Sequence, residues 1–182
     1  MDVSGEYRLS VSRQAVWNAL LDPEILQQCI PGCESFEKLA DDHFQATVKT
    51  AIGPVKATFT SELRIVNPIP PESYRLEGEG KAGAVGFGRG AADVTLREEG
   101  GETVLSYSAD FQVGGRLAQI GSRLVVGATR KIADQFFGRL AGVIDEQAER
   151  LEPPRKGIGK ELVWVAVTVI LVAALIWWLI TR

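Results

Sequence analysis

Apolar and polar residues alternate with a period of two along much of the chain before residue 115, a period typical of β-strands with one buried face. The clearest run extends from Val55 to Ile65, where apolar or small residues alternate with charged or hydroxyl residues. Further runs of this kind lie at 3–11, 44–48, 74–81, 90–97 and 103–112. Because the runs follow one another closely, they predict an antiparallel meander.

Helical patterns occur on both sides of these strands. Two short helices are predicted after the first strand, one that Ser12 can cap and one that begins at Pro23. Further along, apolar residues recur every three or four positions from Leu117 to Val143, which predicts one amphipathic helix of about thirty residues. The order of elements predicts an α+β fold in which a curved antiparallel sheet packs on a long C-terminal helix, the helix-grip arrangement.

A different pattern occupies the C-terminal end, where residues 162–180 carry no charge and Thr168 is the only polar residue. As a helix rising about 1.5 Å per residue, this segment would span about 30 Å, the thickness of the hydrocarbon core of a bilayer. Trp164 and the pair Trp177-Trp178 lie near its two ends, where indole rings favour the membrane interface. The segment is therefore predicted to be a single transmembrane helix.

The charges around this span predict its orientation. Arg155, Lys156 and Lys160 precede it, whereas only Arg182 follows it. Because positive charge favours the cytoplasmic side, we expect a single-pass protein of the cytoplasmic membrane with its N-terminal domain in the cytoplasm. The predicted organisation is a domain at 1–147, a linker rich in Pro, Gly and basic residues at 148–161, and a transmembrane anchor at 162–180.

Composition narrows the possible chemistry. The chain has 20 basic and 23 acidic residues, of which 16 basic and 22 acidic fall before residue 153. An acidic domain without a Lys/Arg run argues against nucleic acid as a partner. One His (His43) and two Cys (Cys29 and Cys33) argue against a multi-His metal site, a disulfide framework and a His-based catalytic triad. We expect no catalytic residue and no metal or covalent cofactor, and we expect His43 to be solvated.

The run from Gly78 to Gly90 contains the Gly-x-Gly-x-x-Gly spacing of dinucleotide-binding loops. In such loops the last glycine opens a helix, whereas the residues that follow here continue a strand pattern. The run is therefore interpreted as strand ends joined by a turn.

Small residues recur at the expected inward positions of the sheet and along the predicted long helix. They are Ala46, Ala57, Ser61, Gly78, Gly80, Ala92, Ser106 and Ala109 on strands, and Gly121, Gly127, Gly138 and Gly142 on the helix. Two interpretations stay open: these residues leave an apolar cavity for a ligand, or they let the helix pack closely on the sheet. The inward apolar residues expected to line such a cavity are Phe59, Leu63, Leu76, Val94, Phe111, Ile120, Leu124 and Phe136.

Arg116, Arg123 and Arg130 recur every seven residues in the predicted helix and would share one face. Such a face can simply be solvated, or it can contact an acidic partner or anionic headgroups. The candidate residues for partner or membrane contact are Arg116, Arg123, Arg130, Arg155, Lys156 and Lys160.

The segment 15–33, and above all its last turn Cys29-Ile30-Pro31-Gly32-Cys33, resembles the CoxG family of carbon monoxide dehydrogenase subunits. The run 78–90, the stretch 115–124 and the segment Asp134-Gln135-Phe136-Phe137 are similar to that family as well. The helix-grip pattern by itself is shared by many START-like (SRPBCC) proteins, whereas these motifs are specific to the family.

This resemblance, which covers about residues 1–147, implies an accessory protein and not a catalyst. It implies binding of a quinone (menaquinone or ubiquinone) or similar lipid in a helix-grip cavity. It also implies recruitment of a molybdenum-dependent carbon monoxide dehydrogenase to the cytoplasmic membrane and a link to the respiratory quinone pool. Relatives occur beside other molybdenum hydroxylases, so that a related hydroxylase is the alternative partner.

Two other hypotheses stay open. One is a pure adaptor or assembly factor for a molybdenum hydroxylase, with a filled core and the arginine face as its docking site. The other is an enzyme, because START-like cavities can host cyclase or hydratase chemistry. An enzyme would need polar groups that converge inside the cavity, and the expected inward positions offer mostly Ser61, Ser106 and Tyr107.

Overall fold

The computed structural model describes residues 1–151. The chain divides into two units, Met1–Ala148 and Glu149–Arg182, and the sheet belongs to the first. The elements are β1 (Asp2–Leu9), α1 (Arg13–Ala19), α2 (Pro23–Cys29), β2 (Cys33–Ala40), β3 (His43–Ile52), β4 (Val55–Ile69), β5 (Ser73–Lys81), the 3₁₀ turn η1 (Gly83–Val85), β6 (Gly86–Glu99), β7 (Glu102–Gly115), α3 (Arg116–Gln119) and α4 (Ser122–Leu151). The predicted transmembrane helix 162–180 and its preceding cations Arg155, Lys156 and Lys160 lie outside the described residues.

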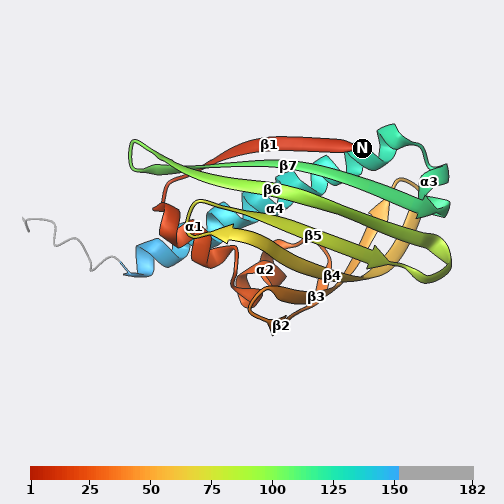
Figure 1. Ribbon diagram of the computed structural model, residues 1–182, viewed down its shortest axis with the longest axis horizontal. Helices are drawn as coiled ribbons and strands as arrows, with labels where there is room; N and C mark the ends of the chain where they lie inside the picture. The colour runs from red at the N-terminus through yellow and green to blue at the C-terminus, as the bar shows by residue number, and fades with distance from the viewer. Residues whose placement is uncertain (152–182) are drawn as a thin grey trace, which may run out of the picture. The chain divides into compact units, whose positions relative to one another are not determined.

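The strands form one antiparallel sheet of seven strands in the order β1-β7-β6-β5-β4-β3-β2. Consecutive strands are neighbours from β2 to β7, and β1 closes the other edge by pairing with β7 from Asp2↔Asp110 to Leu9↔Thr103. The sheet is curved and α4 lies against its concave face, behind the strands in Figure 1. The predicted curved antiparallel sheet packed on a C-terminal helix is confirmed.

The two short helices α1 and α2 begin at side chains that cap them. The Ser12 hydroxyl oxygen accepts a hydrogen bond from the Ala15 N–H at 3.3 Å. The Asp22 carboxylate accepts from the N–H groups of Glu24 and Ile25 at 2.8 and 3.3 Å. These bonds satisfy backbone donors that the first turn of a helix leaves free, and they fix where each helix starts.

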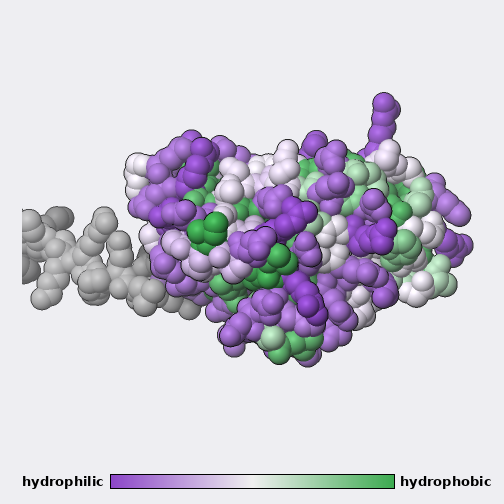
Figure 2. Space-filling model, viewed as in Figure 1, coloured by the Kyte–Doolittle hydropathy of each residue, from purple (hydrophilic) through white to green (hydrophobic). Residues whose placement is uncertain are grey.

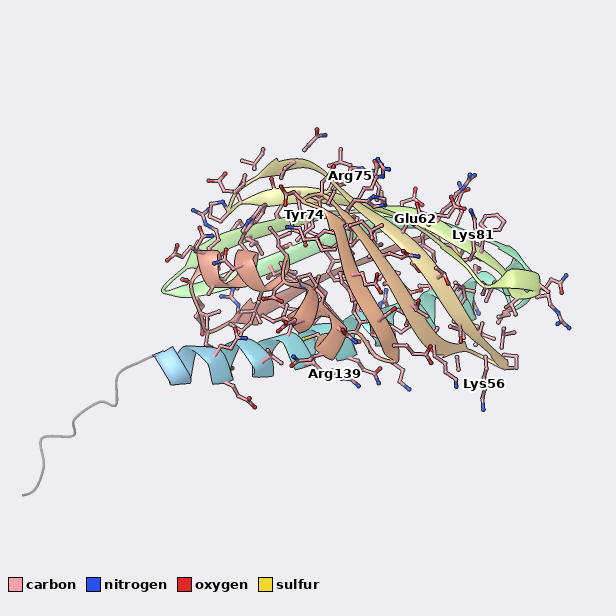
Figure 3. The ribbon with its side chains drawn as sticks, turned by 90° about the horizontal axis from the view of Figure 1, so that it is seen from below. Lys56, Glu62, Tyr74, Arg75, Lys81 and Arg139 are labelled. Carbon is pink, nitrogen blue, oxygen red and sulfur yellow. The ribbon has the colours of Figure 1, made fainter. Side chains whose placement is uncertain are left out.

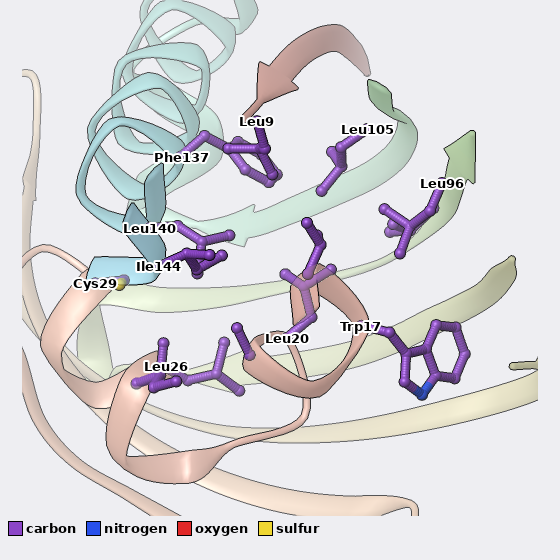
Figure 4. Close-up of a cluster of buried hydrophobic side chains, with 14 of the residues drawn as sticks. Leu9, Trp17, Leu20, Leu26, Cys29, Leu96, Leu105, Phe137, Leu140 and Ile144 are labelled. Atoms are coloured by element: carbon purple, nitrogen blue, oxygen red, sulfur yellow. The ribbon is translucent and has the colours of Figure 1, made fainter. Parts of the chain in front are cut away.

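The core lies between the concave face of the sheet and the helices α1, α2 and α4. Val16 of α1, Leu105 of β7 and Leu140 of α4 are all 0% exposed. Figure 4 shows side chains from these helices and from the strands meeting in this cluster. Burial of the apolar stripe of α4, more than helix propensity, therefore holds this long helix on the sheet.

The convex face of the sheet is different in character, and Figure 2 shows it to be largely hydrophilic. Ion pairs connect strands across it, such as Arg75 of β5 with Asp93 of β6 at 2.8 Å and Arg97 of β6 with Glu6 of β1 at 3.5 Å. Exposed pairs of this kind each contribute less than about 1 kcal/mol. The apolar packing that decides stability is therefore on the concave side.

The prediction of a single long helix is wrong at its beginning. Gly121 has a φ of 96° and separates α3 from α4, because a residue in this left-handed region cannot continue an α-helix. Arg116 consequently belongs to α3, whereas Arg123 and Arg130 belong to α4. The three arginines therefore do not form one continuous stripe.

The other end of α4 also differs from the prediction. The helix continues to Leu151, so that residues 148–151 of the predicted linker are helical. It stops two residues before Pro153, as expected because the residue before a proline disfavours the helical conformation. Among residues 1–151, no helix is long and apolar enough to cross a membrane.

The glycines of the predicted long helix do not face the sheet. A methyl group at Gly127, Gly138 or Gly142 would meet no atom within 4 Å outside the helix's own nearby backbone, and the same holds at Gly121. All four residues are exposed. The expected contribution of these glycines to a cavity or to close packing is therefore wrong, because they lie on the outer side of the helix.

We expect Gly138→Ala to raise the free energy of unfolding by about 1 kcal/mol, because alanine has the higher helix propensity and finds open space here. The midpoint of urea unfolding measures the change. Gly32→Ala is the matched control: Gly32 has a φ of 75° and its added carbon would strike the Lys49 carbonyl oxygen, so that stability should fall. A loss of stability in Gly138→Ala would contradict the exposed position of Gly138.

Candidate functional site

A cavity of about 330 Å³ lies between the concave face of the sheet and the helices α2 and α4. Every side chain that lines it is hydrocarbon except Tyr74, Tyr107 and Thr129. The lining residues are Leu20, Leu26, Ile30, Pro31, Phe36, Phe44, Leu63, Ile65, Tyr74, Leu76, Ala92, Val94, Tyr107, Ala109, Thr129, Ile132, Ala133, Phe136 and Phe137.

The strand register builds the wall of the cavity from inward residues of β5, β6 and β7. Two neighbouring rows cross these strands: Leu76, Ala92 and Ala109 form one, and Tyr74, Val94 and Tyr107 form the other. Alternation sends each residue between them to the convex face. Two of the three side chains in the first row are single methyl groups, and this leaves space beneath α4.

The segment after α2 closes one side of the cavity with Ile30 and Pro31. Gly32 makes the turn that follows possible, because its φ of 75° is unfavourable for other residues. Its carbonyl oxygen accepts a hydrogen bond from the Lys49 N–H at 2.8 Å. The Pro31-Gly32 pair therefore fixes the end of α2 against β3.

Cys29 and Cys33, on either side of this turn, are free thiols. Burial raises the pKa of both. Each is therefore less ionised at neutral pH than an exposed thiol, which makes it a weaker nucleophile and metal ligand. Within residues 1–151 no group of His, Cys, Asp and Glu side chains is arranged to hold a metal ion.

Aromatic rings border the cavity on the side of β1. Tyr7, Tyr107 and Phe137 stack with centroid separations between 4.4 and 6.3 Å. The Tyr7 hydroxyl donates a hydrogen bond of 2.6 Å to Asp134 of α4. Burial, together with this bond, raises the pKa of Tyr7, and burial also raises the pKa of Tyr107. Both phenols therefore stay protonated at neutral pH, and the bond to Asp134 ties α4 to β1.

The two remaining polar side chains of the lining differ in their partners. The Thr129 hydroxyl donates to the Val125 carbonyl oxygen of its own helix at 3.0 Å. Tyr74 is only 7% exposed, and its ring packs edge-on against Trp17 with 5.5 Å between centroids. Its hydroxyl has no hydrogen-bond partner among the described residues. Burial raises the pKa of Tyr74, so that this hydroxyl too is protonated.

The sequence was compared with known families once this geometry was clear. Residues 5–145 match the CoxG family of carbon monoxide dehydrogenase subunits. The chain belongs to the CoxG family. No curated protein sequence matches it.

Solved structures share the fold of this CoxG-family protein. A conserved protein from Geobacillus kaustophilus has 29% identity and a TM-score of 0.75, over 80% of this chain and 96% of that one. A START superfamily protein from Mycobacterium smegmatis has 14% identity and a TM-score of 0.63, over 80% and 98%. The Zhui aromatase/cyclase from Streptomyces sp. R1128 has 10% identity and a TM-score of 0.59, over 81% and 95%.

The described part of the chain therefore has a START-like fold. Because that fold also occurs in an enzyme, it does not by itself decide between binding and catalysis. Membership of the CoxG family together with the fold indicates a ligand-binding accessory role.

Four of the residues predicted to line a cavity in this CoxG-family protein do line it, namely Leu63, Leu76, Val94 and Phe136. They come from β4, β5, β6 and α4, where the period of the sequence is clear. The structure therefore brings together the half of the set that strand alternation and the helical stripe both support. Their role in ligand binding stays a prediction.

The other predicted lining residues, Phe59, Phe111, Ile120 and Leu124, do not line this cavity. Ile120 and Leu124 lie beside Gly53 in the β3–β4 turn, 3.4 and 3.8 Å from the position of an added carbon there. Leu124 is 55% exposed. The break at Gly121 explains their position, because Ile120 does not continue the apolar stripe of α4.

Sequence reasoning missed Tyr74, although a signal for it exists. Tyr74 precedes Leu76 by two residues in one strand, and alternation therefore gives both the same face. The prediction for Ser106 is wrong, because its hydroxyl donates to Glu6 on the convex face at 3.2 Å and its neighbour Tyr107 takes the inward position. Ser61 does not line the cavity either.

His43 is less solvated than expected. Its side chain is 22% exposed, and its Nε2 atom is buried without a hydrogen-bond partner, 3.9 Å from a carboxylate oxygen of Glu62. Both residues lie outside the cavity lining. His43 therefore gives this cavity no acid–base group.

Proposed function

We propose that this CoxG-family protein binds a quinone or a similar lipid and recruits a molybdenum-dependent carbon monoxide dehydrogenase, or a related molybdenum hydroxylase, to the cytoplasmic membrane. It would thereby link that enzyme to the respiratory quinone pool. The apolar cavity of about 330 Å³ between the sheet and α4 carries this proposal. Family membership supports the accessory role.

The chemistry of the lining suits a quinone. A ring with isoprenoid substituents gains about 25 cal/mol for each Å² of apolar surface that it buries against such a wall. The lining has no Asp, Glu, Lys or Arg, so that an ionised ligand would be desolvated without a counter-charge. The volume is near the lower end of the usual range of ligand cavities, about 300 to 1,000 Å³. It suits a quinone ring with the first part of its tail.

Membrane attachment would come from residues 162–180, whose length and composition fit a transmembrane helix. Arg155, Lys156 and Lys160 would lie beside the anionic headgroups of the cytoplasmic leaflet, each adding about 1 kcal/mol of attraction. The cavity would then be held close to the lipid phase from which its ligand comes. A quinone taken up there would be reduced to the quinol by the recruited enzyme and returned.

Cationic side chains on the surface support a docking role toward an acidic partner. Arg123 and Arg130 of α4 are exposed and form no ion pair within residues 1–151. Arg116 lies apart from them, in a surface depression that it lines together with Lys56 and Val55. Charges of one sign on an otherwise acidic domain favour a specific orientation of the partner during encounter.

The direct test is the lipid that the protein carries. We expect the full-length protein, purified from its native membranes, to release a quinone into organic solvent, identified by mass spectrometry and by its ultraviolet absorbance. An unrelated single-pass protein from the same membranes provides the background. Repeated extractions that find no quinone above this background in folded protein would sink the cargo role and favour the pure adaptor.

A further inference from the structure

The Tyr74 hydroxyl is an unpartnered polar group in an otherwise apolar site. The side chain is 7% exposed, lines the cavity, and makes no hydrogen bond with the residues that the structure describes. The other phenol near the cavity with a defined bond, Tyr7, donates to Asp134, and Thr129 donates to a backbone carbonyl. Buried hydroxyls normally have a partner, because an unpaired one loses its hydration without gaining a bond in return.

The surroundings hold Tyr74 in place. Its ring packs edge-on against Trp17 of α1, which is itself 5% exposed. On the sheet, Tyr74 pairs with Val94, and its neighbour Arg75 is fixed on the convex face by a 2.8 Å ion pair with Asp93. Figure 3 labels Tyr74 and Arg75 next to each other on this strand. A side chain that is fixed in this way presents its hydroxyl at a defined position, with little entropy left to lose on binding.

We infer that the Tyr74 hydroxyl is the recognition group of the cavity and hydrogen-bonds to a carbonyl or hydroxyl oxygen of the bound ligand. The inference rests on the proposed function, since it assumes that the cavity binds a ligand. It adds the chemical class: an apolar molecule that carries an oxygen on the part inserted between the sheet and α4. A hydrocarbon of the same shape fills the volume but leaves the hydroxyl unpaired.

The protonation state agrees with this role. Burial raises the pKa of Tyr74, so that the phenol can donate at every pH at which the protein is folded near neutrality. A quinone accepts this bond through a carbonyl, and a quinol accepts it through a hydroxyl oxygen. The same residue can therefore hold both redox states of such a ligand.

The experiment compares two probes on the full-length protein in detergent, measured by calorimetric titration. One probe is a naphthoquinone with a single prenyl group, and the other is the matching naphthalene, which lacks both carbonyl oxygens. We expect Tyr74→Phe to bind the quinone about tenfold more weakly and the naphthalene as tightly as, or more tightly than, the wild type. The infrared carbonyl band of the bound quinone should shift to lower frequency in the wild type and lose that shift in Tyr74→Phe.

A readout on the ligand-free protein separates recognition from structure. Tyr74→Phe should unfold at the same urea concentration as the wild type or a higher one, because no hydrogen bond is lost. The matched variant Tyr7→Phe loses the bond to Asp134 and should unfold at a lower urea concentration. Equal losses of affinity for both probes in Tyr74→Phe, or an unchanged affinity for the quinone, would overturn the inference while leaving the cavity as a binding site. Failure of the wild type to bind either probe would overturn the proposed function with it.

Discussion

Ala92→Phe is expected to lower the affinity for a quinone by at least about a hundredfold while leaving the protein folded. Ala92 lies in the inward row between Leu76 and Ala109, and its methyl group forms part of the cavity wall. A phenyl ring at this position points into the space that the ligand would occupy. Because the space is empty of protein atoms, the ring can be accommodated at a modest cost in packing, about 1 to 3 kcal/mol.

The neighbouring residue provides a matched control. Ala91 has the same side chain but points to the convex face, where it lines a shallow groove with Glu77 and Asp110. Ala91→Phe therefore introduces the same ring into the same strand without touching the cavity. Quinone content after purification and titration with a short-chain quinone measure both variants, and circular dichroism verifies their folding. If Ala92→Phe retained wild-type binding, the ligand would have to bind elsewhere.

Strand periodicity predicted the sheet because most strands have one buried and one solvated face. β4 illustrates both the strength of this signal and its limit. Alternation is clear from Val55 to Ile65, but the strand continues to Ile69 through a register shift after Val66 and a positive φ of 50° at Asn67. The pattern ends where the pairing becomes irregular. No property of single residues marks such a continuation.

The edge strand β2, Cys33–Ala40, was not predicted for a related reason. Phe36 is its only buried residue, and the residues after it are exposed. An edge strand has one neighbour and covers little of the core, so that its sequence carries almost no alternation. Only the partner strand β3, with the pair Phe36↔Ala46, defines it.

The site itself could be predicted only in part, because its shape depends on the rotation of α4. The small residues of the sheet, such as Ala92 and Ala109, do face the cavity, whereas Gly138 faces outward. The break at Gly121 sets where α4 begins, and thus which residues form its inner face. Two open interpretations, a cavity or close packing, are separated by this rotation. The sequence pattern alone does not specify it.

Removal of residues 162–182 is expected to move the protein from the membrane fraction to the soluble fraction. On insertion scales, each Leu, Ile, Val or Phe at the centre of a transmembrane helix contributes about 0.3 to 0.6 kcal/mol, and this segment consists almost entirely of apolar residues. The described domain has a largely hydrophilic convex face, and its own helices do not meet the length and hydropathy of a membrane span. Cell fractionation followed by immunoblotting measures the distribution.

A second variant tests whether anchoring is the only role of the segment. Replacing residues 162–180 by an unrelated run of Leu and Ala of the same length should restore the membrane location, because bilayer insertion depends on length and hydropathy. Protease added to spheroplasts should leave the N-terminal domain intact in both membrane-bound forms, as the cations Arg155, Lys156 and Lys160 predict. Cleavage of the domain from outside would reverse the topology, and would place the cavity on the wrong side of the membrane to serve a cytoplasmic dehydrogenase. A truncated protein that stayed on the membrane would instead assign attachment to the domain itself, with its exposed arginines as the first candidates for the contact.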